Sequence, residues 1–226
     1  MKNPKPDLVI VAHPDDETLF FAGLIQHYSQ RPWQVICVTD GNADGFGKKR
    51  KRQFFSACKA LGVTEPIWLG HKDLFHQRIE VNRLMEQLNS LPKPRRVFTH
   101  NILGEYGHPH HQDVCMAVHE VFFESNTVFS TAYNTYPDLV VKLSHSEYAL
   151  KFHILAKIYS SETSRFINFL PTTWSEGFVK ASAKEVCAIY KFLISGKRPP
   201  LKDLEVFKWY WPFLRVQTLD KAQRPF

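Results

Sequence analysis

Short apolar runs alternate with helix-like segments along the first half of the chain. Strand-like and helix-like segments follow one another in the order 7–12, 17–28, 34–39, 49–61, 66–69, 76–90, 96–99 and 111–124. Runs that are apolar throughout are typical of strands buried on both faces of a sheet. The alternation predicts an α/β fold, in which a doubly wound, Rossmann-like and mostly parallel sheet carries helices on both faces.

The second half is less regular. Residues 129–133 favour a fifth strand, and residues 146–160 and 180–195 favour helices. A chain of 226 residues can bury a core of ordinary size without disulfide staples. We therefore expect one domain over residues 1–226, with a core at about 7–178 and a less regular, basic and aromatic C-terminal segment at 179–226.

The composition narrows the class of protein. The four cysteines form no C-x-x-C pair, so neither a disulfide framework nor a cysteine zinc site is predicted. No apolar run approaches the ~18 residues of a membrane span, and the polar N-terminus does not resemble a signal peptide. We therefore expect a cytoplasmic protein.

The charge is unevenly distributed. Lys and Arg outnumber Asp and Glu by 29 to 22, and five of the basic residues form the run 48–52. Such patches attract anions, although a solvated basic loop is the alternative. The aromatic segment 207–213 is typical either of packing onto the core or of peripheral contact with a membrane surface.

Polar loops follow each of the first four predicted strands. They are residues 13–17, 40–47, 70–75 and 100–111. Because the carboxyl ends of parallel strands meet at one edge of a sheet, we expect these loops to converge on one rim.

Two of these loops carry possible metal ligands. His13 and Asp16 lie three residues apart where a strand turns into a helix, and residues 106–111 contain three histidines. Catalytic zinc takes three nitrogen or oxygen ligands and keeps one position for water. Two ligands from the first loop and one from the second satisfy this pattern and leave Asp15 to act as a base. The alternatives are carboxylates that cap a helix and histidines that are merely exposed.

The motif Ala12-His13-Pro14-Asp15-Asp16-Glu17, with a later His-x-x-His, resembles the LmbE-like or PIG-L family of zinc-dependent de-N-acetylases. The resemblance covers about residues 7–178. Further segments that are similar to the family are 61–63, 68–73, 97–99, 106–111 and 176–178.

The resemblance implies a hydrolase that removes the N-acetyl group from an amino sugar, such as N-acetylglucosamine linked to a glycan, lipid, nucleotide or inositol. An anionic substrate would suit the positive charge. The implied Zn²⁺ ligands are His13, Asp16 and His111. The implied catalytic residues are Asp15 as general base, His108 as electrophile or acid, and Tyr106, which polarises the substrate carbonyl.

Other polar residues on or near these loops are weaker candidates. Asp40, Arg52 and Asp73 are candidates for binding sugar hydroxyls or phosphate. Six other histidines are expected at surface or structural positions, although one of them, His100, follows a strand at the same rim; they are His71, His76, His100, His119, His145 and His153.

One position departs from the family pattern. His110 stands where many members have Asp, which we expect to orient the preceding histidine and keep it charged. Either Glu105 or Asp113 replaces that carboxylate, or His108 works with a lowered pKa.

Three other functions compete with this interpretation. One is hydrolysis of a different small acylated amine by the same zinc site. The second is a nucleic-acid-binding module, suggested by a pI of 9.2 and the run 48–52. The third is an inactive protein on the same fold, which the presence of every metal position argues against.

Overall fold

The computed structural model describes residues 5–75, 77–123, 127–133, 135–163 and 174–195. Within these residues seven strands form a single sheet in the order β3-β2-β1-β4-β5-β7-β6. The strands are β1 (Asp7–Val11), β2 (Trp33–Thr39), β3 (Glu65–His71), β4 (Arg96–Thr99), β5 (Val128–Thr131), β6 (Leu139–Lys142) and β7 (Ser175–Val179). The first five strands are parallel, and β7 runs antiparallel to both β5 and β6. The predicted mostly parallel α/β sheet is confirmed.

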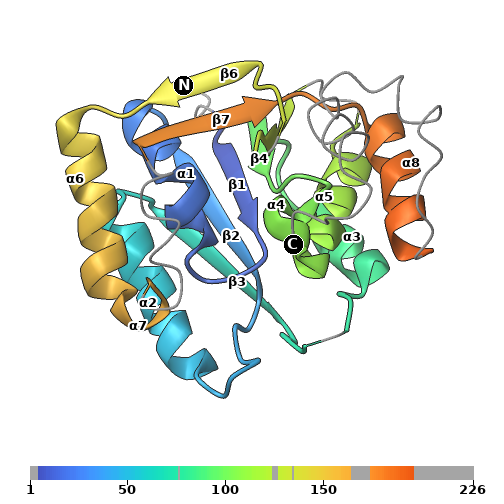
Figure 1. Ribbon diagram of the computed structural model, residues 1–226, viewed down its shortest axis with the longest axis horizontal. Coiled ribbons are helices and arrows are strands. Elements are labelled where there is room, and N and C mark those ends of the chain that lie inside the picture. The colour runs from blue at the N-terminus through green and yellow to red at the C-terminus, as the bar shows by residue number, and fades with distance from the viewer. Residues whose placement is uncertain (1–4, 76, 124–126, 134, 164–173, 196–226) are drawn as a thin grey trace, which may run out of the picture.

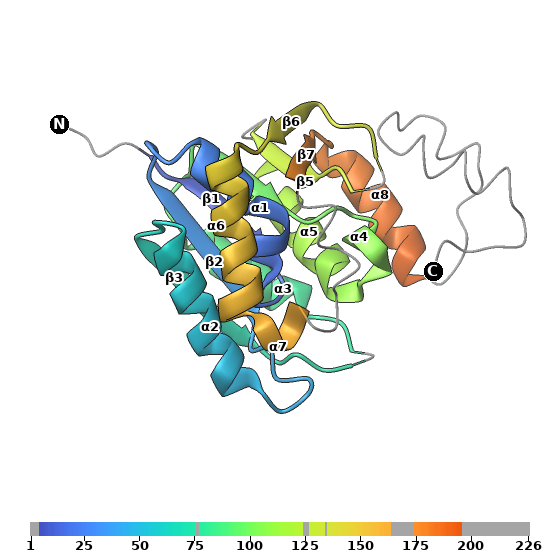
Figure 2. The same cartoon turned by 60° about the vertical axis from the view of Figure 1, so that its left-hand side comes forward.

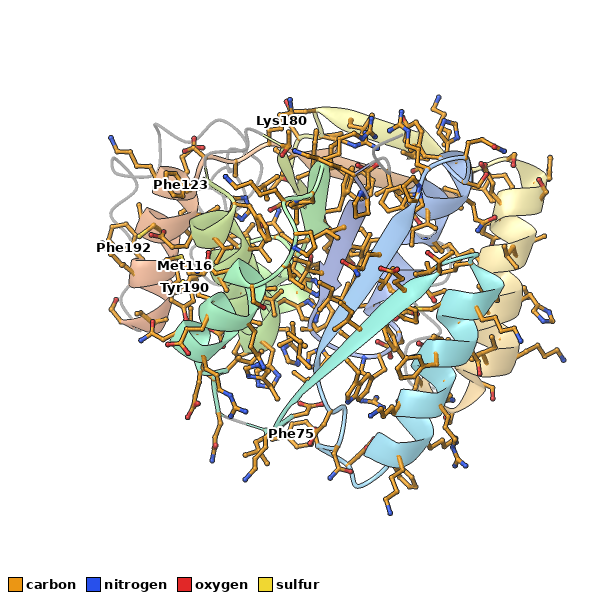
Figure 3. The ribbon with its side chains drawn as sticks, turned by 180° about the vertical axis from the view of Figure 1, so that it is seen from behind. Phe75, Met116, Phe123, Lys180, Tyr190 and Phe192 are labelled. Carbon is orange, nitrogen blue, oxygen red and sulfur yellow. The ribbon has the colours of Figure 1, made fainter. Side chains whose placement is uncertain are left out.

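Helices cover both faces of the sheet (Figure 1). One face carries α1 (Asp16–His27) and α2 (Gly47–Ala60), whose apolar side chains join one core cluster. The other face carries α3 (Val81–Asn89) and α5 (Pro109–Val121), which form a second cluster. The helix α8 (Ala183–Ile194) packs against α5, and Tyr190 and Met116 lie beside each other at this contact (Figures 2 and 3).

The central strand β1 shows why the apolar runs do not alternate between apolar and polar residues. Leu8 and Ile10 face the α3 and α5 side, whereas Val9 and Val11 face the α1 and α2 side. All four side chains are fully buried, because successive residues of a strand point to opposite faces and both faces are covered.

The third helix begins later than predicted. The apolar spacing favours a helix over 76–90, but α3 covers only Val81–Asn89. The preceding residues are held by bonds to α5: the N–H of Ile79 and the guanidinium of Arg78 both donate to Asp113. These tertiary bonds replace the helical ones, and they place the chain across the end of the sheet.

Other parts of the chain also differ from the prediction. The segment 146–160 is divided into α6 (His145–His153), a π-helical turn η2 (Ile154–Ile158) and α7 (Ser160–Thr163). Neither the short turn α4 (Gly104–Gly107) nor the pair β6 and β7 was predicted. The predicted helix 180–195 is confirmed as α8.

The aromatic run 207–213 and His76 lie outside the described residues. Among the helices that the structure describes, none has the length and apolar character needed to cross a membrane.

A carboxylate from the last strand braces the first helix. Glu176 of β7 accepts hydrogen bonds from the backbone N–H groups of Gly23 and Leu24 in α1, at 2.8 and 2.7 Å. Lys151 of α6 donates to the same carboxylate at 2.6 Å and is itself buried. This brace fixes α1, which begins at Asp16, against the far part of the sheet.

Candidate active site

The loops that follow β1, β2, β3 and β4 converge on one cavity, as predicted. Its volume is about 770 Å³, and one of its lining residues, Phe75, lies exposed beyond the end of the sheet (Figure 3). Residues from all four loops line it, together with residues from β5 and β7. The polar lining residues include His13, Asp15, Asp16, Asp44, Arg50, Asp73, Tyr106, His108, His110, Tyr133 and Glu176.

The turn after β1 has a strained backbone. Asp15 has a φ of +110°, in a region that residues other than glycine seldom adopt. Its side chain makes no capping hydrogen bond to α1, so the simple capping role is not what the structure shows. Instead the side chain lines the cavity, while Asp16 begins the helix and accepts the N–H of His13 at 2.7 Å.

The second loop is compact and then enters a helix at once. Gly104 and Glu105 have φ of +72° and +56°, and Pro109 occupies the first turn of α5. Proline suits that position because no N–H is needed there. The preceding His108 caps the helix through Nδ1, which accepts the N–H of His110 at 3.2 Å. The histidines of this loop are thereby brought to β1.

Three atoms from the two loops form a small triangle. Nδ1 of His13 lies 3.2 Å from Nε2 of His111 and 3.4 Å from Oδ2 of Asp16. Nε2 of His111 lies 3.4 Å from the same Oδ2. Ligands about 2.0–2.1 Å from a tetrahedral zinc ion lie about 3.3–3.4 Å from one another. The three predicted ligands therefore have the spacing that a zinc ion requires.

Glu105 holds the third member of this triangle. Its Oε2 accepts from Nδ1 of His111 at 2.6 Å, and its Oε1 accepts from the N–H of Asn101 at 2.9 Å and from the hydroxyl of Thr131. Burial alone would raise the pKa of this carboxyl, but His100 and His111 lower it well below its usual range. Glu105 is therefore a carboxylate that orients His111.

Of the surface and structural positions that the sequence predicts for His100, the structure shows a structural one, next to the triangle. It is fully buried, and its ring stacks on that of His111 at 3.8 Å between centroids. Its Nε2 accepts the N–H of Ala12 at 2.9 Å, and its Nδ1 lies 3.2 Å from Glu105. His100 thus packs against His111, one corner of the triangle, and against Glu105, which orients that corner.

Asp15 has the environment of a base. Burial and the neighbouring carboxylate of Asp16 raise its pKa well above the usual value, although the Arg50 guanidinium opposes this shift. Arg50 in turn forms an ion pair with Glu162. A carboxylate with a raised pKa is better matched to accepting a proton near neutral pH than an ordinary surface carboxylate.

His108 has no carboxylate partner among the described residues. Burial and the nearby rings of His111 and His13 lower its pKa to about 2. Asp113 accepts from Arg78 and Tyr190 instead. Of the three expectations for His108, a lowered pKa is therefore the one that the structure supports, and replacement by Glu105 or Asp113 is wrong.

Tyr106 lies on the same wall. Its ring centroid is 5.5 Å from that of His111 and 6.0 Å from that of His108. Burial, together with Asp16 and Asp15, raises the pKa of its phenol far above the usual value. Tyr106 consequently stays protonated and retains its O–H for donation.

The three weaker candidates lie in different places. Asp73 lines the cavity, and its Oδ1 lies 3.8 Å from Nε2 of His13. Asp40 accepts the N–H groups of Asn42 and Asp73, so it holds the two loops together. Asp40 and Arg52 line a separate hollow next to the cavity, whereas the neighbouring Arg50 reaches the cavity itself. The helical spacing of the basic run separates these two arginines, since they lie on different faces of α2.

The chain belongs to a family of known enzymes. Residues 8–122 match the family model PIG-L, described as GlcNAc-PI de-N-acetylase, so the chain is a member of that family.

Two curated relatives are deacetylases by name. A 1D-myo-inositol 2-acetamido-2-deoxy-alpha-D-glucopyranoside deacetylase of Actinosynnema mirum is 30% identical over 142 residues, which are 46% of this chain and 50% of that protein. A probable N-acetylglucosaminyl-phosphatidylinositol de-N-acetylase of Dictyostelium discoideum is 38% identical over 63 residues, 27% of this chain and 24% of that protein. The chain thus matches half or less of the length of either relative.

The fold is shared with solved deacetylase structures. The N,N'-diacetylchitobiose deacetylase from Pyrococcus horikoshii superposes with a TM-score of 0.63 at 23% identity, covering 80% of this chain and 85% of that one. At this identity the likeness concerns the fold, and the chemistry is argued from the site below.

Proposed function

We propose that this chain is a zinc-dependent de-N-acetylase that acts on an N-acetylated amino sugar. The observation that carries the proposal is the triangle of His13, Asp16 and His111, whose ligand atoms have tetrahedral spacing beside a raised-pKa carboxylate. Membership of the de-N-acetylase family supports it further.

Two other groups of side chains in the described residues could hold a metal, and both are less suitable. The first contains His13, His108 and His110, and the second contains His100, Glu105 and His111. In the first, Nδ1 of His108 already accepts a backbone N–H, and the group itself consists of three histidines without a carboxylate. In the second, His100 is engaged by the backbone of Ala12 and is shut off from the cavity.

The residues around the triangle have different roles in the proposed amide hydrolysis. A zinc ion bound there supplies a Lewis acid that activates water and polarises the amide oxygen. Asp15, beside the ligands, accepts the proton of the attacking water. The same carboxylic acid can then donate that proton to the departing amine, which must leave protonated.

The developing negative charge on the amide oxygen needs donors. Tyr106 is a protonated phenol on the cavity wall. His108 is neutral, and because its Nδ1 accepts a backbone N–H, its second nitrogen Nε2 carries the proton. Both residues therefore offer a hydrogen bond to the oxyanion, and His108 acts as an electrophile and not as a cationic acid.

The cavity suits a substrate of sugar size. A volume of about 770 Å³ lies within the range of small-molecule sites. Asp73, Arg50 and Tyr133 are among the lining residues that can form hydrogen bonds with a substrate, and the guanidinium of Arg50 adds affinity for an anionic substituent. The names of the two deacetylase relatives, which specify N-acetylglucosamine derivatives of inositol, support the same substrate class. A cytoplasmic location stays a prediction.

Acetate release distinguishes the candidates. The zinc-loaded protein is incubated with N-acetylglucosamine linked to UDP, to inositol, to a lipid and to an oligosaccharide, and with a small acylated amine that lacks a sugar. We expect release from at least one sugar conjugate and loss of both zinc and activity in His111→Ala. Release from the sugar-free amine alone would favour the other amide hydrolase, and full zinc occupancy in His111→Ala would refute the ligand set.

A further inference from the structure

His110 contacts a backbone carbonyl with one ring nitrogen and the proposed metal ligand His13 with the other. Its side chain is buried in the first turn of α5. Its Nε2 lies 2.7 Å from the backbone carbonyl oxygen of Gln77, and its Nδ1 lies 3.0 Å from Nε2 of His13. The three groups thus form a chain from the backbone before α3 to the cavity.

The carbonyl fixes the proton positions along this chain. A carbonyl oxygen only accepts, so Nε2 of His110 carries the proton and donates it. In the neutral ring Nδ1 of His110 is then the acceptor, and His13 must donate through Nε2. The other nitrogen of His13, Nδ1, is left with its lone pair facing Asp16 and His111.

No other described residue replaces His110 in this role. Oδ1 of Asp73 lies 3.5 Å from Nδ1 of His110 but 3.8 Å from Nε2 of His13, and the second distance is beyond a hydrogen bond. The backbone also supports the arrangement, since Gln77 belongs to the segment that Asp113 anchors through Arg78 and Ile79.

We propose that His110 is a positioning residue that holds His13 in the tautomer required for metal binding. It does for His13 what Glu105 does for His111, but with a neutral ring and a backbone carbonyl in place of a carboxylate. This inference rests on the proposed metal site. The sequence suggested that the residue at position 110 orients His108. The proposal is that His110, which departs from the family pattern, orients His13.

Zinc affinity tests the role without any substrate. The affinities of the unchanged protein, His110→Ala and His110→Asn are measured by competition with a chromogenic chelator. Oδ1 of asparagine occupies roughly the place of Nδ1 and can still accept from His13, whereas alanine cannot. We expect His110→Ala to bind zinc about 10–100-fold more weakly, the usual effect of losing such a partner, and His110→Asn to stay within about threefold.

A matched control separates this effect from general loosening. His119 is a buried histidine of the same helix; among the described residues its ring bonds only to Cys115, and it does not line the cavity. His119→Ala should leave the zinc affinity unchanged. Equal affinities in His110→Ala and the unchanged protein would overturn the proposal, as would equal losses in His110→Asn and His110→Ala.

Nitrogen-15 NMR of the imidazoles reads the tautomers directly in the unchanged, metal-free protein. We expect the proton of His13 on Nε2, that of His110 on Nε2 and that of His111 on Nδ1. A proton on Nδ1 of His13 would overturn the proposal even if His110→Ala did not fold. Neither the zinc affinities nor the NMR spectra depend on acetate release. If they give the expected results but the protein releases no acetate, the proposed function is wrong and the role of His110 stands.

Discussion

Oε2 of Glu105 lies 2.6 Å from Nδ1 of His111, with both side chains fully enclosed by protein. Because a carboxylate can only accept, His111 donates from Nδ1 and turns the lone pair of Nε2 toward Asp16. A carboxylate partner also makes an imidazole a more basic ligand. The finding leads to the first prediction.

Replacing Glu105 by Gln should weaken zinc binding. Glutamine keeps an acceptor near His111 but removes the negative charge, so we expect an affinity about 10–100-fold lower, measured by chelator competition. Thr131→Val is the control, since it removes one hydrogen bond to the same carboxylate but leaves the charge. If the two variants lose zinc equally, the charge of Glu105 has no special effect on the metal.

Replacing Asp15 by Asn should separate metal binding from turnover. Asparagine tolerates positive φ, so the backbone turn is kept, while the base is lost. We expect full zinc content and a kcat lower by roughly 10²–10⁴-fold, the usual contribution of positioned proton transfer. Asp44→Asn, which changes another carboxylate of the cavity wall, should have a much smaller effect. Undiminished turnover in Asp15→Asn would place the base elsewhere.

The stability of the protein should depend on pH through Asp7. Burial raises the pKa of this carboxyl, but hydrogen bonds and charges from Arg95 and Arg96 outweigh burial and lower it below the usual value. A lowered pKa in the folded state contributes stability above the unfolded pKa of about 3.9, and that stability is lost as pH falls through the folded pKa.

Asp7→Asn should therefore unfold more easily at neutral pH, by about 1–3 kcal/mol, and its stability should fall less steeply in acid. Denaturant unfolding at pH 7 and pH 3 measures both effects. Arg95 is half exposed, so Arg95→Gln should show a smaller loss than Asp7→Asn. Parallel pH profiles for Asp7→Asn and the unchanged protein would contradict the assignment.

Removing one partner of the buried pair Lys151 and Glu176 should be costly. Lys151→Met leaves the Glu176 carboxylate buried without its cation, and we expect a loss of about 3–5 kcal/mol in the free energy of unfolding. The double variant Lys151→Met with Glu176→Gln should recover part of this loss, because no unpaired charge remains. Additive losses in the double-mutant cycle would show that the two side chains do not act as a pair.

The fold was predictable where local pattern and burial agree. The apolar runs of β1, β2 and β4 predicted buried parallel strands, because both faces of each strand are covered. The late start of α3 was not predictable, because bonds from Arg78 and Ile79 to Asp113, far along the chain, replace the helical ones. The strands β6 and β7 are only four and five residues long and carry little pattern of their own.

The loops that form the candidate site were predictable from the sequence. The motif at residues 12–17 and the histidines of 108–111 identify the loops, and the rule that strand ends share an edge brings them together. The partners that fix proton positions were not predictable. His100 is a lone histidine in the sequence, and the contact between His110 and Gln77 depends on a segment expected to be helical. Such contacts depend on tertiary placement, which no local spacing encodes.

The brace between β7 and α1 has a consequence for how the protein is made. Glu176 contacts Gly23 across 153 positions of sequence, and α1 carries the proposed ligand Asp16 at its start. Ribosomes deliver the chain from its N-terminus, so every ligand of the triangle emerges before the carboxylate that secures the first helix. Contacts of such separation form slowly, because a long loop must close first. A nascent chain halted after residue 122 would hold all the matched family segment, yet α1 would lack its brace.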